Sequence, residues 1–337
     1  MRISFAISLL CLLFTTAHAQ KKLSVTSPDG QVRLNVSLSD KVYYDVESHG
    51  ETLVKNGHLG MTLDKANLGA NPVLKGKKVK TVNETVTPIF SLKSANIDNR
   101  YTSLLMNMKG GYAIEWRVYD DGLAYRFVTS IKGDVKVLSE DFCIQLTQDT
   151  RLVLQQPGGF KTSCEEEYTN VQSAAWKAED RMSELPLVIA GAKQKVFVSE
   201  FDLFDYPGMF MKGNADNSLS AVHPKVPVEF GDDGDRSVKI LKEADYIAET
   251  NGTRSFPWRF MHITQDDKQM AVNTMPMRLA PVSVIDDPSW IKVGKTTWEW
   301  WNGSIPYGPD VNFVSGLNLD TYKYFVDFAA ANGLQYI

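Results

Sequence analysis

The sequence has few cysteines, few histidines and no excess of basic charge. Its 337 residues include three Cys and five His, and 36 Lys and Arg against 40 Asp and Glu give a formal net charge of −4. Nucleic acid binding needs clustered Lys and Arg to neutralise phosphates, so this balance argues against a nucleic acid partner. Hydrophobic residues make up 43% and charged residues 23%, which is ordinary for a globular domain and argues against a disordered chain, a collagen and a multi-span membrane protein.

Several short motifs with a known chemistry are missing. The sequence has no P-loop, no GxGxxG, no HExxH and no CxxC. The histidines beyond the first 20 residues are scattered, with no evident Ser or Cys nucleophile beside them. The acidic stretch 231–235 lacks the spacing and the closing Glu of an EF-hand, so we interpret it as a hairpin turn.

The first 20 residues have the pattern of a signal peptide. Arg2 is followed by an apolar run, residues 3–14, that is too short to span a bilayer comfortably. Ala17 and Ala19 form a small-x-small cleavage site. We predict cleavage after Ala19 and a secreted or periplasmic protein without a membrane span. Loss of Arg2 makes the mature charge 35 − 40 = −5.

Two cysteines remain after this cleavage, Cys143 and Cys164. In an oxidising compartment they can form a disulfide that closes a loop of about 20 residues, which contributes roughly 3 kcal/mol. Two free thiols are an equally good interpretation. Neither the number nor the spacing of the cysteines suits a zinc site.

Residues 20–285 have the pattern of a large β domain. Short runs of alternating apolar and polar residues, such as 32–38, 42–46 and 112–118, are separated by turns rich in Gly and Asp. No strong helical period interrupts them, which favours a sandwich or barrel. Because about 260 residues is more than an immunoglobulin-sized sandwich needs, we predict a large sandwich of two sheets.

The pattern changes at about residue 286. Residues 295–301 are predicted to be a strand, Asp320 is expected to cap a helix that ends at Asn332-Gly333, and residues 334–337 begin a second strand. Strand–helix–strand is the repeating unit of a parallel α/β fold, which needs more strands than these two. We therefore expect residues 286–337 to be the start of an incomplete domain and the sequence to be the front part of a longer protein.

Four of the seven Trp lie between residues 290 and 301. If residues 295–301 form the first strand of a (β/α) barrel, the end of this strand faces the active site. Indole rings match the C–H faces of sugars, and Glu and Asn side chains can bond to hydroxyl groups. The alternative is that the rings fill a core or a seam between domains. The candidate sugar-binding residues are Trp298, Glu299, Trp300, Trp301 and Asn302.

Three consecutive glutamates, Glu165, Glu166 and Glu167, follow Cys164 in a segment with the composition of a loop. A run of carboxylates is usually a solvated surface. Alternatively, one of them points inward as an oxygen ligand for Ca²⁺.

Over its whole mature length the sequence resembles the N-terminal part of glycoside hydrolase family 97, the bacterial α-glycosidases. The order and spacing of five segments carry the resemblance. These segments are Ser27 to Gly30, Arg117 to Phe127, Ser199 to Gly208, Phe256 to Arg259 and Trp298 to Asn302.

The resemblance implies a mainly β fold, in which a mutarotase-like β-super-sandwich (20–285) precedes a (β/α)8 barrel truncated after its first strand–helix–strand (286–337). It also implies Ca²⁺ at the active site, with Glu165 as the ligand from the N-terminal domain and Glu166 or Glu167 as its alternatives. The Trp-Glu-Trp-Trp-Asn segment is similar to the retaining, α-galactosidase-like branch, whose catalytic carboxylates would lie beyond residue 337. We therefore expect an oligosaccharide substrate, and no activity from this chain alone.

Two other functions fit parts of the pattern. In a non-catalytic carbohydrate-binding module or an inactive fragment, the sandwich would be the functional unit and the residues after it a remnant. A sugar mutarotase shares the large sandwich, but no His/Glu pair in the sequence points to that activity.

Overall fold

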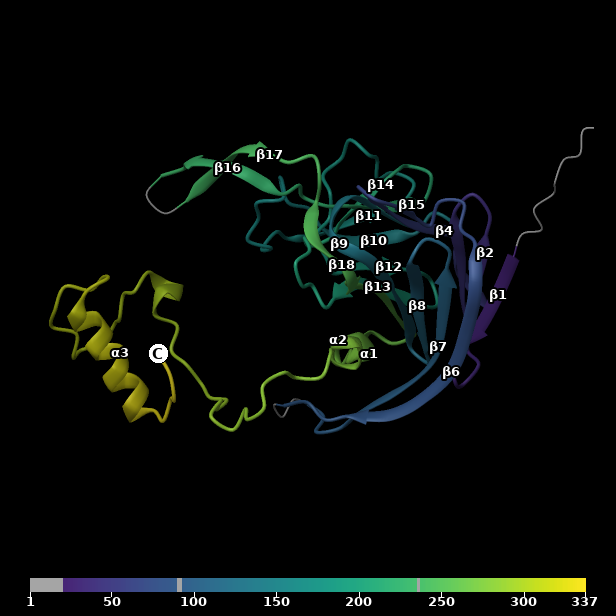
Figure 1. Ribbon diagram of the computed structural model, residues 1–337. Helices are drawn as coiled ribbons and strands as arrows, with labels where there is room; N and C mark the ends of the chain where they lie inside the picture. Colours follow the sequence, from purple (N-terminus) through teal and green to yellow (C-terminus); the bar gives the residue numbers. More distant parts are fainter. Residues whose placement is uncertain (1–20, 90–92, 235–236) are drawn as a thin grey trace, which may run out of the picture. The chain divides into compact units, whose positions relative to one another are not determined.

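The computed structural model describes residues 21–89, 93–234 and 237–337, apart from the side chain of Asn302. The predicted signal peptide, residues 1–19, lies outside the described residues. The described residues divide into two compact units, one of residues 21–87 and 93–281 and one of residues 88–89 and 282–337. We call them the sandwich unit and the C-terminal unit and describe each by itself (Figure 1).

The sandwich unit is built almost entirely of antiparallel strands. The strands of its first half are β1 (Lys21–Thr26), β2 (Val32–Leu38), β3 (Val42–Ser48), β4 (Glu51–Leu63), β5 (Asn67–Leu68), β6 (Leu74–Val86), β7 (Ile97–Met108), β8 (Tyr112–Tyr119) and β9 (Gly122–Gln145). Those of its second half are β10 (Arg151–Gln155), β11 (Tyr168–Gln172), β12 (Leu187–Ala190), β13 (Lys195–Phe201), β14 (Phe210–Gly213), β15 (Ser218–Val222), β16 (Pro227–Asp232), β17 (Val238–Glu243), β18 (Ala248–Ser255) and β19 (Trp258–Thr264).

Strand β9 joins two facing layers of strands. Its first half pairs with β8 on one side and with β19 on the other, within the layer β6-β7-β8-β9-β19-β13-β12-β10-β11. Its second half pairs with β4 and β15, within the layer β1-β2-β3-β4-β9-β15-β14. One strand of 24 residues thus belongs to both layers. The predicted large two-sheet sandwich is confirmed in this form.

The core lies between the layers and follows from the alternation in the sequence. In β2, Val32, Leu34 and Val36 point inward, and the residues between them are less buried. Aromatic rings meet across the gap, since the ring centroid of Tyr44 in β3 lies 5.5 Å from that of Trp116 in β8. An alternating strand buries one face, so the register of each strand is fixed by which residues must leave water.

Two short helices, α1 (Asp267–Ala271) and α2 (Met275–Leu279), follow β19. They were not predicted from the sequence. Met275 and Leu279 join a second apolar cluster with Tyr119, Trp258 and Phe260 on the outer face of the larger layer. This layer is therefore covered on both faces in that region, which explains why every residue of β19 is buried.

Strands β16 and β17 form a separate two-stranded sheet, with Asp232 paired to Val238. This pairing confirms the predicted hairpin, although residues 235 and 236 of its turn lie outside the described residues. The hairpin extends away from the sandwich layers (Figure 1).

In the C-terminal unit, the predicted strand over residues 295–301 is wrong. Only Thr296 makes a β-bridge in this segment, parallel to Tyr336, and residues Glu299–Asn302 form a 3-10 helix, η1. A strand needs hydrogen-bonded neighbours along its length, and the described residues supply just this one bridge to the segment. The start of a barrel therefore stays a prediction.

The predicted helix is confirmed as α3 (Leu319–Ala331). Its cap is Asn318, whose side chain accepts a hydrogen bond from the backbone N–H of Thr321, so the helix begins one residue before Asp320. Asn332 ends it as expected. Among the described residues, no helix is both long and apolar enough to cross a bilayer.

Candidate functional site

The acidic segment lies in the irregular loop between β10 and β11, as the sequence predicted. Side chains at both ends hold this loop. Gln155 Nε2 donates to the Glu166 carbonyl oxygen over 2.6 Å, and Thr162 Oγ1 donates to Glu184 Oε1 over 2.5 Å. Cys164 has a φ of 58°, which turns the chain directly before Glu165. The backbone that carries Glu165 is thus anchored to the sandwich.

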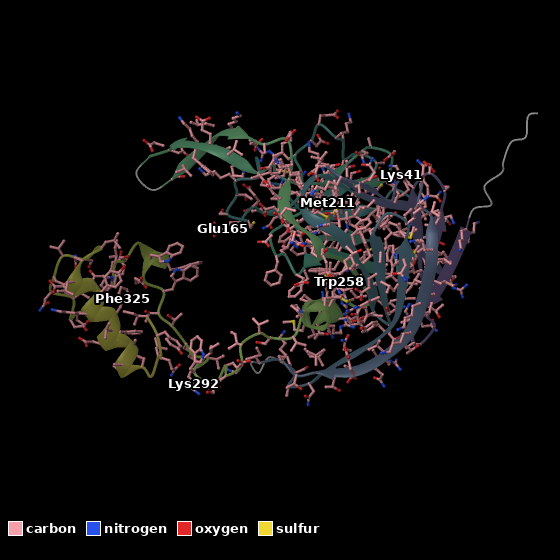
Figure 2. All side chains as sticks on the ribbon, viewed as in Figure 1. Lys41, Glu165, Met211, Trp258, Lys292 and Phe325 are labelled. Atoms are coloured by element: carbon pink, nitrogen blue, oxygen red, sulfur yellow. The ribbon has the colours of Figure 1, made fainter. Side chains whose placement is uncertain are left out.

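Glu165 itself is exposed, on the side of the sandwich unit from which the β16–β17 hairpin emerges (Figure 2). None of the described residues makes a hydrogen bond or an ion pair with its carboxylate. The described part of the chain also contains no group of three or more His, Cys, Asp or Glu that could hold a metal ion. Because Ca²⁺ takes six to eight oxygen ligands, these residues alone do not form a complete calcium site.

A cavity of about 640 Å³ lies beside this loop. Lys161 closes one side of it, because its Nζ donates to Asp233 Oδ2 and to the Val238 carbonyl oxygen, both over 2.9 Å, and so ties the loop to the hairpin. Aromatic and charged side chains line the cavity together, which is a common composition for a small-molecule site. They include Phe160, Lys161, Asp205, Tyr206, Glu243 and Tyr246.

A buried ion cluster lies behind Tyr206. The guanidinium of Arg259 donates to both carboxylate oxygens of Glu140, over 2.8 Å and 2.6 Å, and also to Glu200. Tyr206 Oη donates to Glu140 Oε2 over 2.8 Å, and His223 Nε2 lies 3.3 Å from Arg259 Nη2. The side chains of Arg259, Glu140 and His223 are almost completely buried.

The cluster shifts the pKa values of its members in different directions. Burial acts against the ionised form of Glu140, but Arg259 outweighs it and lowers the pKa of Glu140 to about 2. Burial lowers the pKa of His223 to about 4, against the opposing effect of Glu140. Burial also raises the pKa of Glu200 above its ordinary value, although Arg259 opposes this.

These shifts predict a loss of stability in acid. Between about pH 6.5 and 4 the unfolded state takes up a proton on His223 that the folded state does not, and between about pH 4.5 and 2 the same holds for Glu140, so the free energy of unfolding falls in both windows. The pKa of Glu200 is raised in the folded state, so protonation of this carboxyl as the pH falls favours the folded state and opposes the other two effects. We expect thermal melts to show a steady fall in Tm below pH 6.5. In His223→Gln the fall between about pH 6.5 and 4 should be smaller, and the part due to His262, whose pKa burial also lowers, should remain. An unchanged profile would contradict the assignment.

Three of the segments that carry the family resemblance contribute residues at this place. Trp258 is completely buried, and the guanidinium carbons of Arg117 and Arg126 lie 4.5 Å and 4.2 Å from its ring centroid. Trp258 and Arg259 come from the segment 256–259, the two other arginines from 117–127, and Glu200 and Tyr206 from 199–208. Three of the five segments thus meet at β19, where one face carries Trp258 with the two arginines and the other carries the Arg259 ion cluster.

In the C-terminal unit the tryptophans are exposed. Trp298, Trp300 and Trp301 expose 53%, 63% and 75% of their surface. The ring of Trp298 lies 5.0 Å from each of the other two, so the three side chains form one aromatic cluster. Glu299 is half-buried within η1, and the side chain of Asn302 lies outside the described residues. Among these residues of the C-terminal unit, the indoles fill no core.

The decisive comparison is with known families. The sequence model described as Glycosyl-hydrolase 97 N-terminal matches residues 25–281 of the chain. The chain belongs to glycoside hydrolase family 97.

Two curated relatives agree with this family. The chain is 35% identical to a retaining alpha-galactosidase of Bacteroides thetaiotaomicron, over 98% of the chain and 51% of that protein. It is 25% identical to a probable retaining alpha-galactosidase of Streptomyces bingchenggensis, over 96% of the chain and 48% of that protein. The chain therefore spans about half the length of the curated relatives that it matches.

Solved structures agree on the fold of this family 97 chain. A family 97 enzyme from Pseudoalteromonas sp. strain K8, solved in complex with acarbose, matches with a TM-score of 0.75 at 16% identity, over 93% of this chain and 46% of that one. A beta-arabinopyranosidase matches with a TM-score of 0.73 at 22% identity, over 93% of this chain and 50% of that one. The mainly β fold predicted from the sequence is thus confirmed.

The candidate residues of this family 97 chain fall into two groups. Glu165 belongs to the sandwich unit, whereas the segment 298–302 belongs to the C-terminal unit. Sequence reasoning missed the cavity beside the Glu165 loop and the Arg259 cluster, because the members of each lie far apart in the sequence, from Phe160 to Glu249 and from Glu140 to Arg259. Both cysteines are free, with Cys143 buried and Cys164 exposed, so the free-thiol interpretation holds in this structure.

Proposed function

We propose that this chain is the N-terminal portion of a retaining α-glycosidase that hydrolyses terminal α-glycosidic bonds of oligosaccharides. The observation that carries the proposal is the 35% identity to a retaining alpha-galactosidase over 98% of the chain. An α-galactoside is the first substrate to test, and an α-glucoside is the second.

In this proposal residues 1–19 are a signal peptide, residues 20–285 are the N-terminal super-sandwich, and residues 286–337 begin the catalytic barrel. The enzyme would be periplasmic or secreted. The apolar run before Ala19 and the parallel bridge between Thr296 and Tyr336 support this division.

Glu165 would supply one oxygen ligand to a Ca²⁺ ion. The hard carboxylate oxygens of Glu165 suit calcium, its loop is anchored at Gln155 and Thr162, and no described residue competes for the carboxylate. The described residues offer only this part of the coordination shell. When bound, calcium supplies a Lewis acid that can polarise a substrate oxygen.

The aromatic cluster of Trp298, Trp300 and Trp301 would form a wall of the sugar-binding site, with Glu299 and Asn302 as hydrogen-bonding groups. Its support is the exposure of three adjacent rings, whose flat apolar faces complement the C–H faces of a sugar ring. A retaining mechanism also needs two carboxyl groups about 5–5.5 Å apart, one as nucleophile and one as acid/base. We assign neither role within these 337 residues.

The test is hydrolysis of nitrophenyl α-galactoside by the full-length product of the gene, followed by NMR of the first anomer released. We expect release of the α anomer, and a loss of activity when calcium is chelated. In the same assay Trp300→Ala should raise KM by about tenfold, which corresponds to roughly 1.4 kcal/mol of lost binding. Release of the β anomer would contradict the retaining mechanism.

A non-catalytic carbohydrate-binding module is the second candidate. The cavity beside Glu165, with Phe160 and Tyr246 among charged side chains, is the observation that favours it. Binding of galactosides without any hydrolysis by the full-length product would support this function and rule out the first.

A further inference from the structure

A second cavity, of about 340 Å³, lies in the sandwich unit at the end of the strands away from Glu165. Glu165 is close to Gln155, the last residue of β10. The opposite end of β10, Arg151, pairs with Ala190, and the register continues through Lys195 to Thr264. The cavity opens at this opposite end. Its lining includes Ser48, His49, Asp120, Asp121, Gln194, His262, Gln265, Gln269 and Val272.

Two buried side chains in its wall, Gln194 and His262, have polar atoms without a hydrogen-bond partner among the described residues. Gln194 is 4% exposed, and its Nε2 donates to the Ser48 carbonyl oxygen over 2.9 Å and to Glu51 Oε2 over 3.3 Å. These bonds fix the orientation of the amide, and no described residue donates to its Oε1. His262 is 3% exposed, and its Nδ1 lies 3.5 Å from Asp121 Oδ2. Neither ring nitrogen, however, meets hydrogen-bond geometry with a described residue.

Unsatisfied buried polar atoms are costly, at about 1–3 kcal/mol each, so native proteins rarely leave them without a partner. Gln194 Oε1 requires a donor. A neutral imidazole such as His262 offers one donor and one acceptor. A partner for both residues must therefore carry groups that donate and groups that accept hydrogen bonds.

Each of the two aspartates in the cavity wall, Asp120 and Asp121, is already paired with an arginine. Arg278 donates to the two oxygens of Asp121 over 2.8 Å and 2.6 Å, and Arg100 pairs with Asp120. Burial lowers the pKa of His262, while Asp121 and the nearby backbone of Gln269 and Asp121 oppose this. A cation would need unpaired carboxylates and an anion would need unpaired cations, so the cavity favours a neutral ligand.

We infer that this cavity binds a neutral polyhydroxylated molecule, a monosaccharide, with hydrogen bonds to Gln194 and His262. Hydroxyl groups both donate and accept hydrogen bonds, which matches the unpaired Oε1 of Gln194 and the unpaired ring nitrogens of His262. The volume lies at the lower end of the range for small-molecule sites, roughly 300–1,000 Å³. No Phe, Tyr or Trp ring is among the lining residues, so binding relies on hydrogen bonds and the expected dissociation constant is about 1 mM or weaker. The inference is independent of the proposed hydrolase activity.

The experiment uses saturation-transfer NMR and calorimetry with D-galactose and D-glucose as probes. The wild-type chain should bind at least one of them. Val272→Trp places a large ring at the exposed rim of the cavity, and Gln194→Met removes the unpartnered oxygen, so each should weaken binding at least tenfold. Val272→Trp decides the result if Gln194→Met does not fold.

Trp300→Ala is the control for the other aromatic site, because it changes the C-terminal unit and leaves this cavity intact. It should not change the binding that Val272→Trp removes. The inference is overturned if neither sugar binds at concentrations well above the millimolar range, since the cavity then holds only water. It is also overturned if adding Val272→Trp to Trp300→Ala does not weaken the binding that remains in Trp300→Ala, or if Trp300→Ala alone abolishes all binding.

Discussion

Glu165→Ala is expected to lower kcat/KM of the full-length gene product toward nitrophenyl α-galactoside by about a hundredfold at micromolar calcium. The variant loses a carboxylate oxygen that no described residue uses, on a loop whose anchors at Gln155 and Thr162 remain. Millimolar calcium should restore part of the activity, because the other ligands of the ion would be unchanged. The measurement is a calcium titration of activity, in which the half-maximal calcium concentration of the variant should rise by at least tenfold.

The two neighbouring glutamates are the matched controls. Glu166→Ala and Glu167→Ala remove the same charge from the same exposed loop, so they should leave the calcium dependence within about twofold of the wild type, as expected for solvated surface charges. If one of these variants shows the shift and Glu165→Ala does not, the ligand is that neighbour. If all three titrate like the wild type, the loop has no role in holding the metal.

Alternation along the strands made most of the sandwich predictable. The inward residues of β2 and β3 are the ones that the sequence pattern selects, because a strand with one buried face must place every second residue in the core. The role of β9 could not be predicted. Its membership of both layers depends on pairings with β4, β15 and β19, which lie far away in the sequence and leave no local signal.

One local signal did mark a special position in this strand. Gly122, after the two aspartates of the predicted turn, has a φ of 151°, and a Cβ there would lie 2.1 Å from the Met261 carbonyl oxygen. Only glycine allows β9 to begin so close to β19. The sequence indicated a turn at this point, but it did not indicate the close approach of Gly122 to the backbone of Met261.

The site was less predictable than the fold. Glu165 was predicted from its neighbours in the sequence and from the family resemblance, and its role stays a prediction, whereas the predicted loop that carries it is confirmed. The strand assigned to residues 295–301 was wrong, because a tryptophan-rich run has strand propensity but strand formation depends on hydrogen-bonding partners. Gln194 and His262 gave no signal at all, since their significance is a lack of partners that only the folded structure reveals.

Arg259→Met is the substitution expected to destabilise the sandwich unit most. The guanidinium is the one cation that faces Glu140 and Glu200 in the cluster when His223 is neutral. Removing it leaves two carboxylates in a buried place, and breaking a buried ion pair in this way costs about 3–5 kcal/mol. Urea titration of the wild type and the variant should show this as a lower midpoint at unchanged slope.

A surface pair provides the matched control for this experiment. Lys55 bonds to Asp45 over 2.7 Å but exposes 56% of its side chain, so Lys55→Met should cost less than about 1 kcal/mol. Glu140→Met combined with Arg259→Met should be less destabilising than the sum of the two single changes, because the double variant removes one of the stranded carboxylates together with the guanidinium. If Arg259→Met costs no more than Lys55→Met, the cluster is solvated in solution. The pH dependence assigned to His223 and Glu140 would then be lost with it, because burial lowers the pKa of His223 and the contact with Arg259, which water would screen, lowers that of Glu140.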